Sequence, residues 1–222
     1  GWSRTGFDGG RHDTWHMTGH SQQLKKITDR VAGPVLGRYT VHIDWKTKAG
    51  KVILEEARTI TVYRQPEPAL MLMDLSTSLK AVNGDVELAG DPEHAGCQYR
   101  PHNEVARNKS ARYLFPLEEI NEGNVNKTRD MPWAALSYKL GENTYEVQHL
   151  SHPDIPKGNV YSAYRDYGRF GAYFKTTVAK GETLSLQYRI RVAEGELGER
   201  EAYARRYTAF AKPVKAVLDA PK

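Results

Sequence analysis

Cysteine, long apolar runs and low-complexity tracts are scarce or missing in this chain of 222 residues. Its single cysteine, Cys97, excludes an internal disulfide and any zinc site built on several thiolates. No apolar run approaches the roughly 20 residues that a transmembrane helix needs, which excludes a bundle of membrane helices. No internal repeat and no linker rich in Pro, Gly or Ser divides the chain, so we expect a single domain over residues 1–222.

A large excess of one charge is missing as well. Lysine and arginine together number 32 and aspartate and glutamate 27, which gives a formal net charge of +5. The basic residues are spread along the chain, and no block of five or more occurs. Because a nucleic-acid footprint needs clustered basic residues, we expect no nucleic-acid partner.

The short motifs of common enzyme classes are also absent. The sequence contains no GxSxG, no GxGxxG, no P-loop and no HExxH. A nucleophilic role for Cys97 is conceivable, but reactive cysteines need exposure and nearby positive charge. We therefore expect Cys97 to be a buried structural thiol.

What the chain does contain is a succession of strand patterns separated by turn signals. Residues 183–192 alternate most regularly, with apolar side chains on one face and polar side chains on the other. Residues 48–51 predict a hairpin turn, and Asn83-Gly84 predicts another. The chain is therefore predicted to be all-β, an antiparallel β-sandwich. The spacing of apolar residues over 199–210 predicts a short C-terminal helix packed on it.

Three polar clusters carry the candidate chemistry, and the first lies near the start of the chain. His12, His16 and His20 recur at a spacing of four, which would place three imidazoles on one face of a helix, where they could bind a metal. Glycines such as Gly9 and Gly19 argue against a helix, and an extended segment would spread the imidazoles apart. These histidines are weak metal candidates, and the sequence assigns no cofactor.

The second cluster begins at Glu93 and His94. On a strand, Gln98 and Arg100 would share one face. A carboxylate, an imidazole and a guanidinium would then line one edge of a sheet. The alternative is a solvated hairpin that carries an ion pair.

The third cluster is the densest. His149 and His152 end one predicted strand, and Arg165, Asp166 and Tyr167 follow after a loop. His, Arg, Asp and Tyr beside Gly and Pro are typical of a site built on loops that a rigid sheet positions. The alternative is that Arg165 and Asp166 form a structural salt bridge.

Several segments resemble a known family. They are Gly1-Trp2-Ser3, residues 54–60 (LEEARTI), Glu93-His94-Ala95-Gly96, Met131-Pro132-Trp133-Ala134, His152-Pro153 and Tyr164-Arg165-Asp166-Tyr167-Gly168-Arg169-Phe170. From Gly1 to about Glu196, the chain is similar to a bacterial domain family of unknown function that is labelled methane oxygenase PmoA. The Arg-Asp-Tyr-Gly run downstream of His-Pro is the most specific part of this resemblance.

The resemblance implies a galactose-mutarotase-like sandwich. It also implies an exported protein, secreted or periplasmic, of a polysaccharide-degrading bacterium. Members have an N-terminal portion before the position of Gly1, so we expect that a preceding segment is missing here or is supplied by a partner chain. The oxygenase label fits poorly, since methane oxygenase subunits are membrane proteins and this chain has no apolar run of membrane length.

We expect a carbohydrate-active protein that acts on a sugar or glycoside by acid and base chemistry, through hydrolysis, elimination or epimerisation. His149 and His152 are the candidate acid and base, with Glu93 or Asp166 as the partner carboxylate. The candidate substrate-binding residues are Arg100 and Arg165 as anion clamps, Tyr167 and Trp133 as stacking groups, and Gln98 and His94. The alternatives are a non-catalytic carbohydrate-binding module, a metal-dependent oxygenase and a structural component without a ligand.

Overall fold

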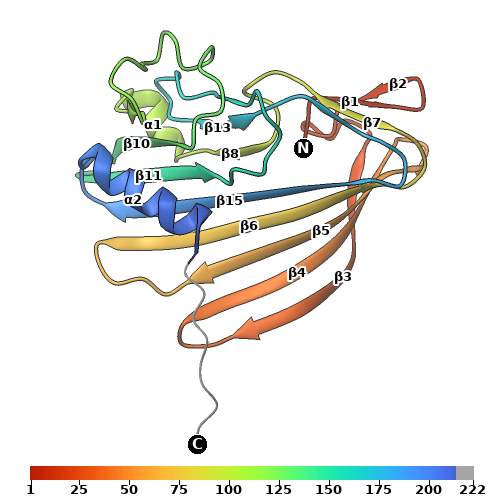
Figure 1. The fold of residues 1–222 in the computed structure, drawn as a ribbon, viewed down its shortest axis with the longest axis horizontal. Helices are drawn as coiled ribbons and strands as arrows, with labels where there is room; N and C mark the ends of the chain where they lie inside the picture. The colour runs from red at the N-terminus through yellow and green to blue at the C-terminus, as the bar shows by residue number, and fades with distance from the viewer. Residues whose placement is uncertain (214–222) are drawn as a thin grey trace, which may run out of the picture.

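The computed structural model describes residues 1–213 and shows an all-β sandwich (Figure 1). The fold-class prediction is therefore confirmed, whereas the likeness to galactose mutarotase and the single domain stay predictions. Residues 214–222, which the predicted domain includes, lie outside the described residues. Neither helix within residues 1–213 has the length and apolar character to cross a membrane.

The largest sheet has eight antiparallel strands in the order β3-β4-β5-β6-β15-β11-β10-β9. These strands are β3 (Ser21–Ala32), β4 (Leu36–Lys46), β5 (Val52–Tyr63), β6 (Ala69–Ala81), β9 (Arg112–Leu114), β10 (Trp133–Leu140), β11 (Asn143–Ser151) and β15 (Thr183–Glu194). The alternating segment 183–192 thus becomes a central strand, because its apolar face meets the core and its polar face points away from it.

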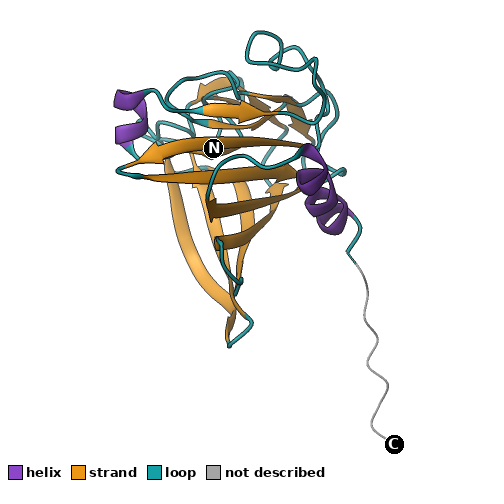
Figure 2. Ribbon diagram, turned by 90° about the vertical axis from the view of Figure 1, so that its left-hand side faces the viewer, coloured by secondary structure: helices purple, strands orange, loops and turns teal. Residues whose placement is uncertain are grey.

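Two smaller sheets lie on one side of the large one (Figures 1 and 2). The first has the order β14-β7-β1-β2 and the second the order β12-β13-β8. Their strands are β1 (Arg4–Phe7), β2 (Gly10–His12), β7 (Val86–Ala89), β8 (Cys97–Tyr99), β12 (Val160–Tyr161), β13 (Phe170–Tyr173) and β14 (Thr176–Val178). They cover the part of the large sheet around β15, whereas β3, β4 and β5 extend beyond them (Figure 1).

Two helices complete the described chain. The short helix α1 (Asn103–Asn108) precedes β9, and α2 (Arg200–Ala211) follows β15. The C-terminal helix predicted over residues 199–210 is confirmed to within a residue at each end. Helix α2 packs on β10 and β11, because Tyr203 and Phe210 form a small buried cluster with Trp133 and Leu150.

The Asn83-Gly84 turn differs from its prediction. Residues 48–51 do connect paired strands, β4 and β5, but β6 and β7 on either side of Asn83-Gly84 belong to different sheets. Neither Asn83 nor Gly84 has the positive φ that a tight type I′ hairpin requires. The turn instead carries the chain from one layer to the other, and the Asn83 amide donates to the Val52 carbonyl at 3.0 Å.

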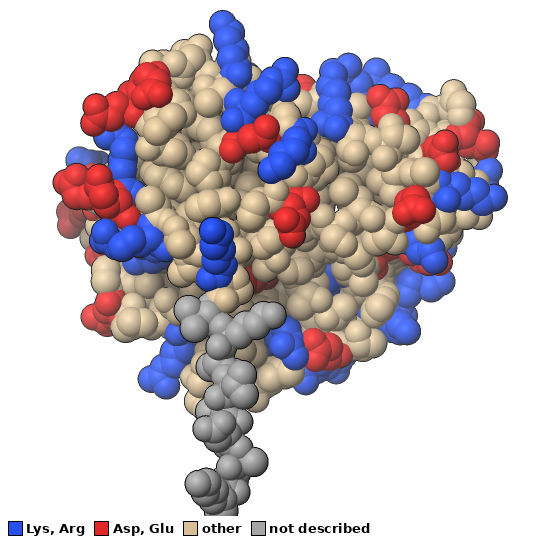
Figure 3. All heavy atoms as spheres, viewed as in Figure 1, with Lys and Arg blue, Asp and Glu red and all other residues tan. Residues whose placement is uncertain are grey.

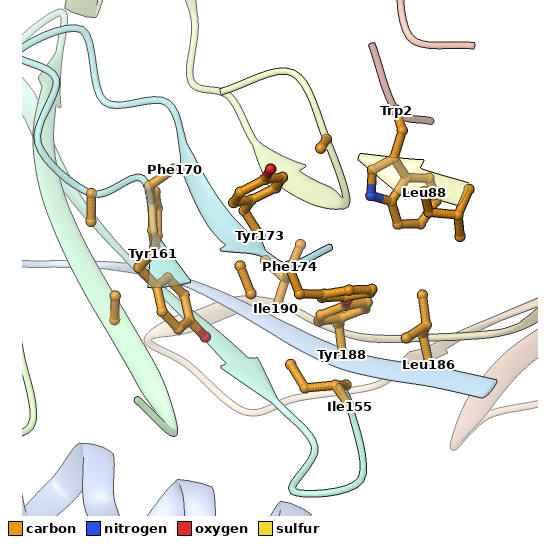
Figure 4. Packing of buried hydrophobic residues seen from close by; sticks show 14 of the residues in the cluster. Trp2, Leu88, Ile155, Tyr161, Phe170, Tyr173, Phe174, Leu186, Tyr188 and Ile190 are labelled. Carbon is orange, nitrogen blue, oxygen red and sulfur yellow. The ribbon is translucent and has the colours of Figure 1, made fainter. Parts of the chain in front are cut away.

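The main core lies between the layers (Figure 4). Leu186, Tyr188 and Ile190 of β15 point toward Trp2 and Phe174, which come from the covering segments. The Trp2 and Phe174 rings meet edge to face with centroids 5.9 Å apart. This packing fixes the covering sheets on the β15 region and leaves the outer strands to form one side of a cleft.

The outer strand β3 lies at the edge of the large sheet. Its pairing with β4 is irregular between Leu24 and Lys26 and again between Thr28 and Val31. Asp29 lies in the second irregularity with a φ of 50°. Bulges of this kind bend a strand and interrupt its ladder of hydrogen bonds.

The core makes a stability prediction. Leu136 on β10 is fully buried, so Leu136→Ala removes apolar contacts and leaves a cavity. We expect the free energy of unfolding, measured by urea denaturation, to fall by about 2–5 kcal/mol. The matched control is Leu117→Ala, which alters a leucine that is 54% exposed and should change it by less than about 0.5 kcal/mol. Equal effects of the two substitutions would contradict this account of the core.

Candidate functional site

A cleft of about 460 Å³ lies between the large sheet and the N-terminal segment. One wall comes from strands β3 to β6 and β15 of the large sheet, and the other from the segments around Trp2 and Trp15 and from Gly96 and Cys97 at the start of β8. The lining residues are Gly1, Trp2, Thr14, Trp15, Met17, Gln22, Trp45, Glu56, Arg58, Ile60, Leu75, Thr77, Leu79, Gly96, Cys97, Leu186 and Tyr188. We call it the Glu56 cleft, after the carboxylate in its lining.

The strand period explains why polar and apolar groups share this wall. Glu56, Arg58 and Ile60 are two residues apart on β5, so their side chains project from the same face of the sheet. Arg58 pairs across to Thr77 of β6, and Thr77 in turn pairs to Leu186 of β15. Glu56, Arg58 and Thr77 therefore form a group of polar side chains on a face of the sheet that is otherwise apolar.

Glu56 is surrounded by donors from three neighbouring strands. The Trp45 indole Nε1 donates to Oε2 at 2.7 Å, and the Thr77 hydroxyl donates to Oε1 at 2.6 Å. Arg58 donates from Nε to Oε1 and from Nη2 to Oε2, each at 2.8 Å. This fork-to-fork arrangement is the strongest pairing available to a carboxylate and a guanidinium.

The environment keeps Glu56 ionised. Its side chain is only 3% exposed, and burial alone would raise the pKa of Glu56. The hydrogen bonds and charge of Arg58, with the bonds from Thr77 and Trp45, outweigh burial and lower the pKa below its ordinary value. Glu56 is therefore an acceptor that orients its neighbours, and it is not a proton donor near neutral pH.

Arg58 retains hydrogen-bonding capacity toward the cleft. Its two bonds to Glu56 use two of the five N–H groups of the guanidinium. Within residues 1–213 the other three have no protein partner, and the side chain is 29% exposed. Arg58 can thus donate to a ligand without leaving Glu56.

The aromatic walls are rigid on one side and more open on the other. Trp2 and Trp45 are buried, with ring centroids 6.2 Å apart, whereas Trp15 is only partly buried. Tyr188 adds a further buried ring to the wall. An apolar hollow with a few fixed polar groups is the usual form of a small-molecule site.

Cys97 lies in the same wall and is partly buried. Its desolvated position raises the pKa of the thiol to about 12, so it carries no thiolate at neutral pH. This agrees with the predicted structural role and gives no support to a cysteine nucleophile.

A second polar assembly, the Glu93 cluster, joins the second and third sequence clusters. The Glu93 carboxylate accepts from Tyr164 and Tyr167 Oη and from Arg169 Nη2, each at 3.0 Å, and from Arg165 Nε at 2.9 Å. The sequence predicted Glu93, Arg165 and Tyr167 as parts of one site, and the structure brings these three together. The cluster ties the loop before β13 to the loop before β8.

The donors also set the ionisation of Glu93. Burial would raise its pKa, but the bonds from Arg165, Tyr164 and Tyr167 lower the pKa from 4.5 to about 2. Glu93 is therefore a poor general acid. The alternative prediction, a salt bridge between Arg165 and Asp166, is wrong, because Arg165 pairs with Glu93 and Asp166 lies 3.3 Å from Lys109 Nζ.

Glycine permits the approach of the two strands beside this cluster. A Cβ on Gly171 of β13 would lie 2.0 Å from the Cys97 carbonyl oxygen of β8, so no other residue fits there. The close approach that glycine allows at this position is between two backbones.

The other predicted catalytic residues lie elsewhere. His149 is fully buried, with Nδ1 3.2 Å from the Tyr161 hydroxyl, and burial lowers the pKa of its imidazole to about 4. His152 lines a separate hollow of about 330 Å³ that includes Thr59 and Ser76. No hydrogen bond or ion pair among residues 1–213 joins either histidine to Glu93. Their catalytic roles stay predictions, and the structure does not place them in one cleft.

The predicted binding residues are also dispersed. Trp133 is buried and stacks on Tyr203 of α2, with centroids 5.3 Å apart, so a sugar cannot stack on it without displacing the helix. Arg100 lines a small hollow beside Tyr167 and Arg169. The Gln98 amide donates to the carbonyl of Ala95 at 3.0 Å and serves the loop.

The three N-terminal histidines do not form one group. His12 Nδ1 and His20 Nε2 are 3.0 Å apart, whereas His16 bonds to Asp13. The expectation that glycines oppose a helix here is confirmed, because the segment forms β2 and turns in which Met17 and Gly19 have positive φ. Within the described residues, no group of three or more His, Cys, Asp or Glu side chains could hold a metal ion.

Sequence reasoning missed the Glu56 cleft. The signal was present in part, since Glu56 and Arg58 interrupt the apolar face of a strand, and residues 54–60 belong to the segments that carry the family resemblance. What the sequence could not show is that Trp15 and Trp45, 30 positions apart, line the same hollow.

The charged groups of the surface are distributed without a dominant patch on the face in view (Figure 3). Lys and Arg lie among Asp and Glu, with other residues between them. This distribution differs from the clustered basic surface that binds nucleic acid. The absence of a nucleic-acid partner stays a prediction.

The sequence pattern of the Family of unknown function (DUF6807) matches residues 1–207, and the chain belongs to this family. The methane oxygenase label stays a prediction. No curated protein matches the sequence. Among solved structures, a heparan sulfate lyase, HepC from Pedobacter heparinus, is similar with a TM-score of 0.44 and 9% identity over 88% of this chain and 24% of that one.

An alpha-galactosidase from Lactobacillus brevis is similar with a TM-score of 0.39 and 10% identity, over 86% of this chain and 28% of that one. The chain thus spans about a quarter of the length of these structures.

The Glu93 cluster makes a pH prediction. Because the folded pKa of Glu93 lies below the ordinary value, its stabilisation is present above about pH 4.5 and is lost as the pH falls toward 2. We expect Glu93→Gln to lower the free energy of unfolding by about 2 kcal/mol at pH 7, and by little near pH 2. Denaturant titrations at several pH values measure this, with exposed Glu122→Gln as the control. A constant difference between wild type and Glu93→Gln at all pH values would refute it.

Proposed function

We propose that this protein binds a carbohydrate in the Glu56 cleft. The observation that carries the proposal is a 460 Å³ hollow in which aromatic rings surround a carboxylate–guanidinium pair. Its volume lies within the range of about 300–1,000 Å³ that small-molecule sites occupy. The sequence independently predicts a carbohydrate-active protein through its family resemblance.

Sugars match both kinds of surface in the cleft. Their C–H faces are apolar and pack on aromatic rings such as Trp15, while their hydroxyl groups need fixed donors and acceptors. Arg58 supplies free N–H groups, and Thr77 lies beside it with its hydroxyl engaged by Glu56. The polar groups are held by one another, so little side-chain entropy is lost when a ligand binds.

The charge of the cleft favours a neutral sugar. Glu56 and Arg58 carry opposite charges and are bonded at two points, so the pair as a whole is neutral. An acidic sugar would bring a second negative charge close to the buried Glu56 carboxylate, which already balances the charge of Arg58. We therefore propose neutral glycans as the ligand class.

Binding is the part of the predicted function that this cleft supports. Glu56 accepts from all its neighbours and cannot donate a proton near neutral pH, and His149 and His152 do not line the hollow. Sugar chemistry by an acid and a base therefore stays a separate proposal, as does an exported location. Product analysis after prolonged incubation with each glycan that binds distinguishes an enzyme from a binding module.

Substitution of the open wall tests the proposal. We expect wild-type protein to bind at least one neutral oligosaccharide in isothermal titration calorimetry. Trp15→Ala should weaken binding by about tenfold or more, equivalent to about 1.4 kcal/mol, because the ring loses its contact with the sugar face. The control is Tyr39→Ala, which removes an aromatic side chain that is 41% exposed and outside the cleft.

A second substitution tests the polar half of the cleft. Arg58→Lys keeps the positive charge beside Glu56 but loses the planar fork and its additional donors. We expect weaker sugar binding with a similar far-ultraviolet circular dichroism spectrum. If the Trp15→Ala and Arg58→Lys variants both bind the wild-type ligand normally, the sugar site lies elsewhere. If only uronates or sulfated glycans bind, the proposed ligand class is wrong.

A further inference from the structure

Two histidines from distant parts of the chain face each other near the Glu56 cleft. His16 lies in the N-terminal segment and His94 in the loop before β8, and their ring centroids are 5.1 Å apart with 38° between the ring planes. Both are accessible, with side chains 52% and 31% exposed. Neither the predicted metal set nor the proposed sugar site pairs these two residues.

Each imidazole is held by an aspartate carboxylate, and in both rings the contacting atom is Nδ1. His16 Nδ1 lies 2.7 Å from Asp13 Oδ2, and His94 Nδ1 lies 2.7 Å from Asp91 Oδ1. The aspartates are fixed in turn, since Asp13 accepts from the His16 backbone N–H at 2.8 Å and Asp91 from the Glu93 backbone N–H at 3.0 Å.

The carboxylates determine which nitrogen is available. When Nδ1–H donates to an aspartate, the neutral imidazole carries its lone pair on Nε2. A carboxylate bonded to Nδ1 also fixes the orientation of the ring, as is usual for histidines that bind metals. His16 and His94 therefore offer two oriented Nε2 ligands, and within residues 1–213 neither Nε2 atom has a hydrogen-bond partner.

The ring separation agrees with a shared ion. With a metal–nitrogen bond of about 2.0–2.1 Å, the centres of two imidazoles on one tetrahedral ion lie about 5 Å apart. The observed separation is 5.1 Å. We propose that His16 and His94 bind a divalent transition-metal ion through their Nε2 atoms.

The donor set selects the class of metal. Imidazole nitrogen suits Zn²⁺, Cu²⁺ and Ni²⁺, whereas Mg²⁺ and Ca²⁺ require oxygen ligands. No third His, Cys, Asp or Glu joins the pair within the described residues, so water completes the coordination. Asp13 and Asp91 balance the charge of the ion from behind the rings. His12 and His20 bond to each other and form a different pair.

The proposed metal site adjoins the Glu56 cleft through Trp15. The Trp15 ring meets the His94 ring edge to face, with centroids 6.0 Å apart, and Trp15 also lines the cleft. The metal proposal stands independently of sugar binding, because it rests on contacts outside the cleft lining.

Titration of the metal-free protein with Cu²⁺ and Zn²⁺ tests the proposal. By isothermal calorimetry we expect one equivalent of Cu²⁺ to bind, and the electron paramagnetic resonance spectrum should show coordination by two imidazole nitrogens. His16→Ala and His94→Ala should each weaken binding at least tenfold, and Asp91→Asn should weaken it by about tenfold to a hundredfold through the orientation of His94.

His12→Ala is the matched control, since it removes a histidine from the other pair in the same segment. Thermal unfolding of each variant without metal establishes that it folds, and His94→Gln serves where His94→Ala does not. Absence of stoichiometric binding would overturn the proposal, as would a loss on His12→Ala without one on His94→Ala. Sugar binding by the metal-free protein is a separate measurement, so failure of one proposal does not produce failure of the other.

Discussion

Glu56 is a carboxylate on a sheet face where most of its neighbours are apolar. A charge in that position is tolerated only if protein groups replace the water that it has lost. Trp45 from β4, Arg58 from its own strand and Thr77 from β6 do so, and each is thereby fixed in orientation. The shape and polarity of the cleft follow from this requirement, because the groups that satisfy the carboxylate are also the groups that line the hollow.

Glu93 meets the same requirement in a different setting. Its donors all come from one segment, which includes Tyr164, Arg165 and Arg169, so the bonds connect two loops and do not cross a sheet. Glu56 therefore makes one wall of the cleft polar, whereas Glu93 holds two irregular loops in place. In both cases the bonded groups favour the ionised form, which makes these acids structural at neutral pH.

Strand periodicity allowed much of the fold to be predicted, because the residues of a half-buried strand alternate between apolar ones that face the core and polar ones that face solvent. The prediction failed where tertiary contacts decide, as at Asn83-Gly84, where a favourable hairpin dipeptide leads into another sheet. For the site, residue types sufficed to group Glu93 with Arg165. They did not show that His149 is enclosed, since enclosure depends on which layer covers β11, and this is decided by segments far away in the chain.

The irregular edge strand β3 has a consequence for solubility. A straight, unpaired strand of its length would expose a row of backbone donors and acceptors to any other extended chain. The two interruptions in its register break that row, and Asp29 lies in the second of them. At the first interruption, Lys25 and Lys26 put positive charges where an additional strand would have to pair. If the residues at these two interruptions were removed and β3 became a regular strand, copies of the protein would thus associate edge to edge. The contacts of the core would remain.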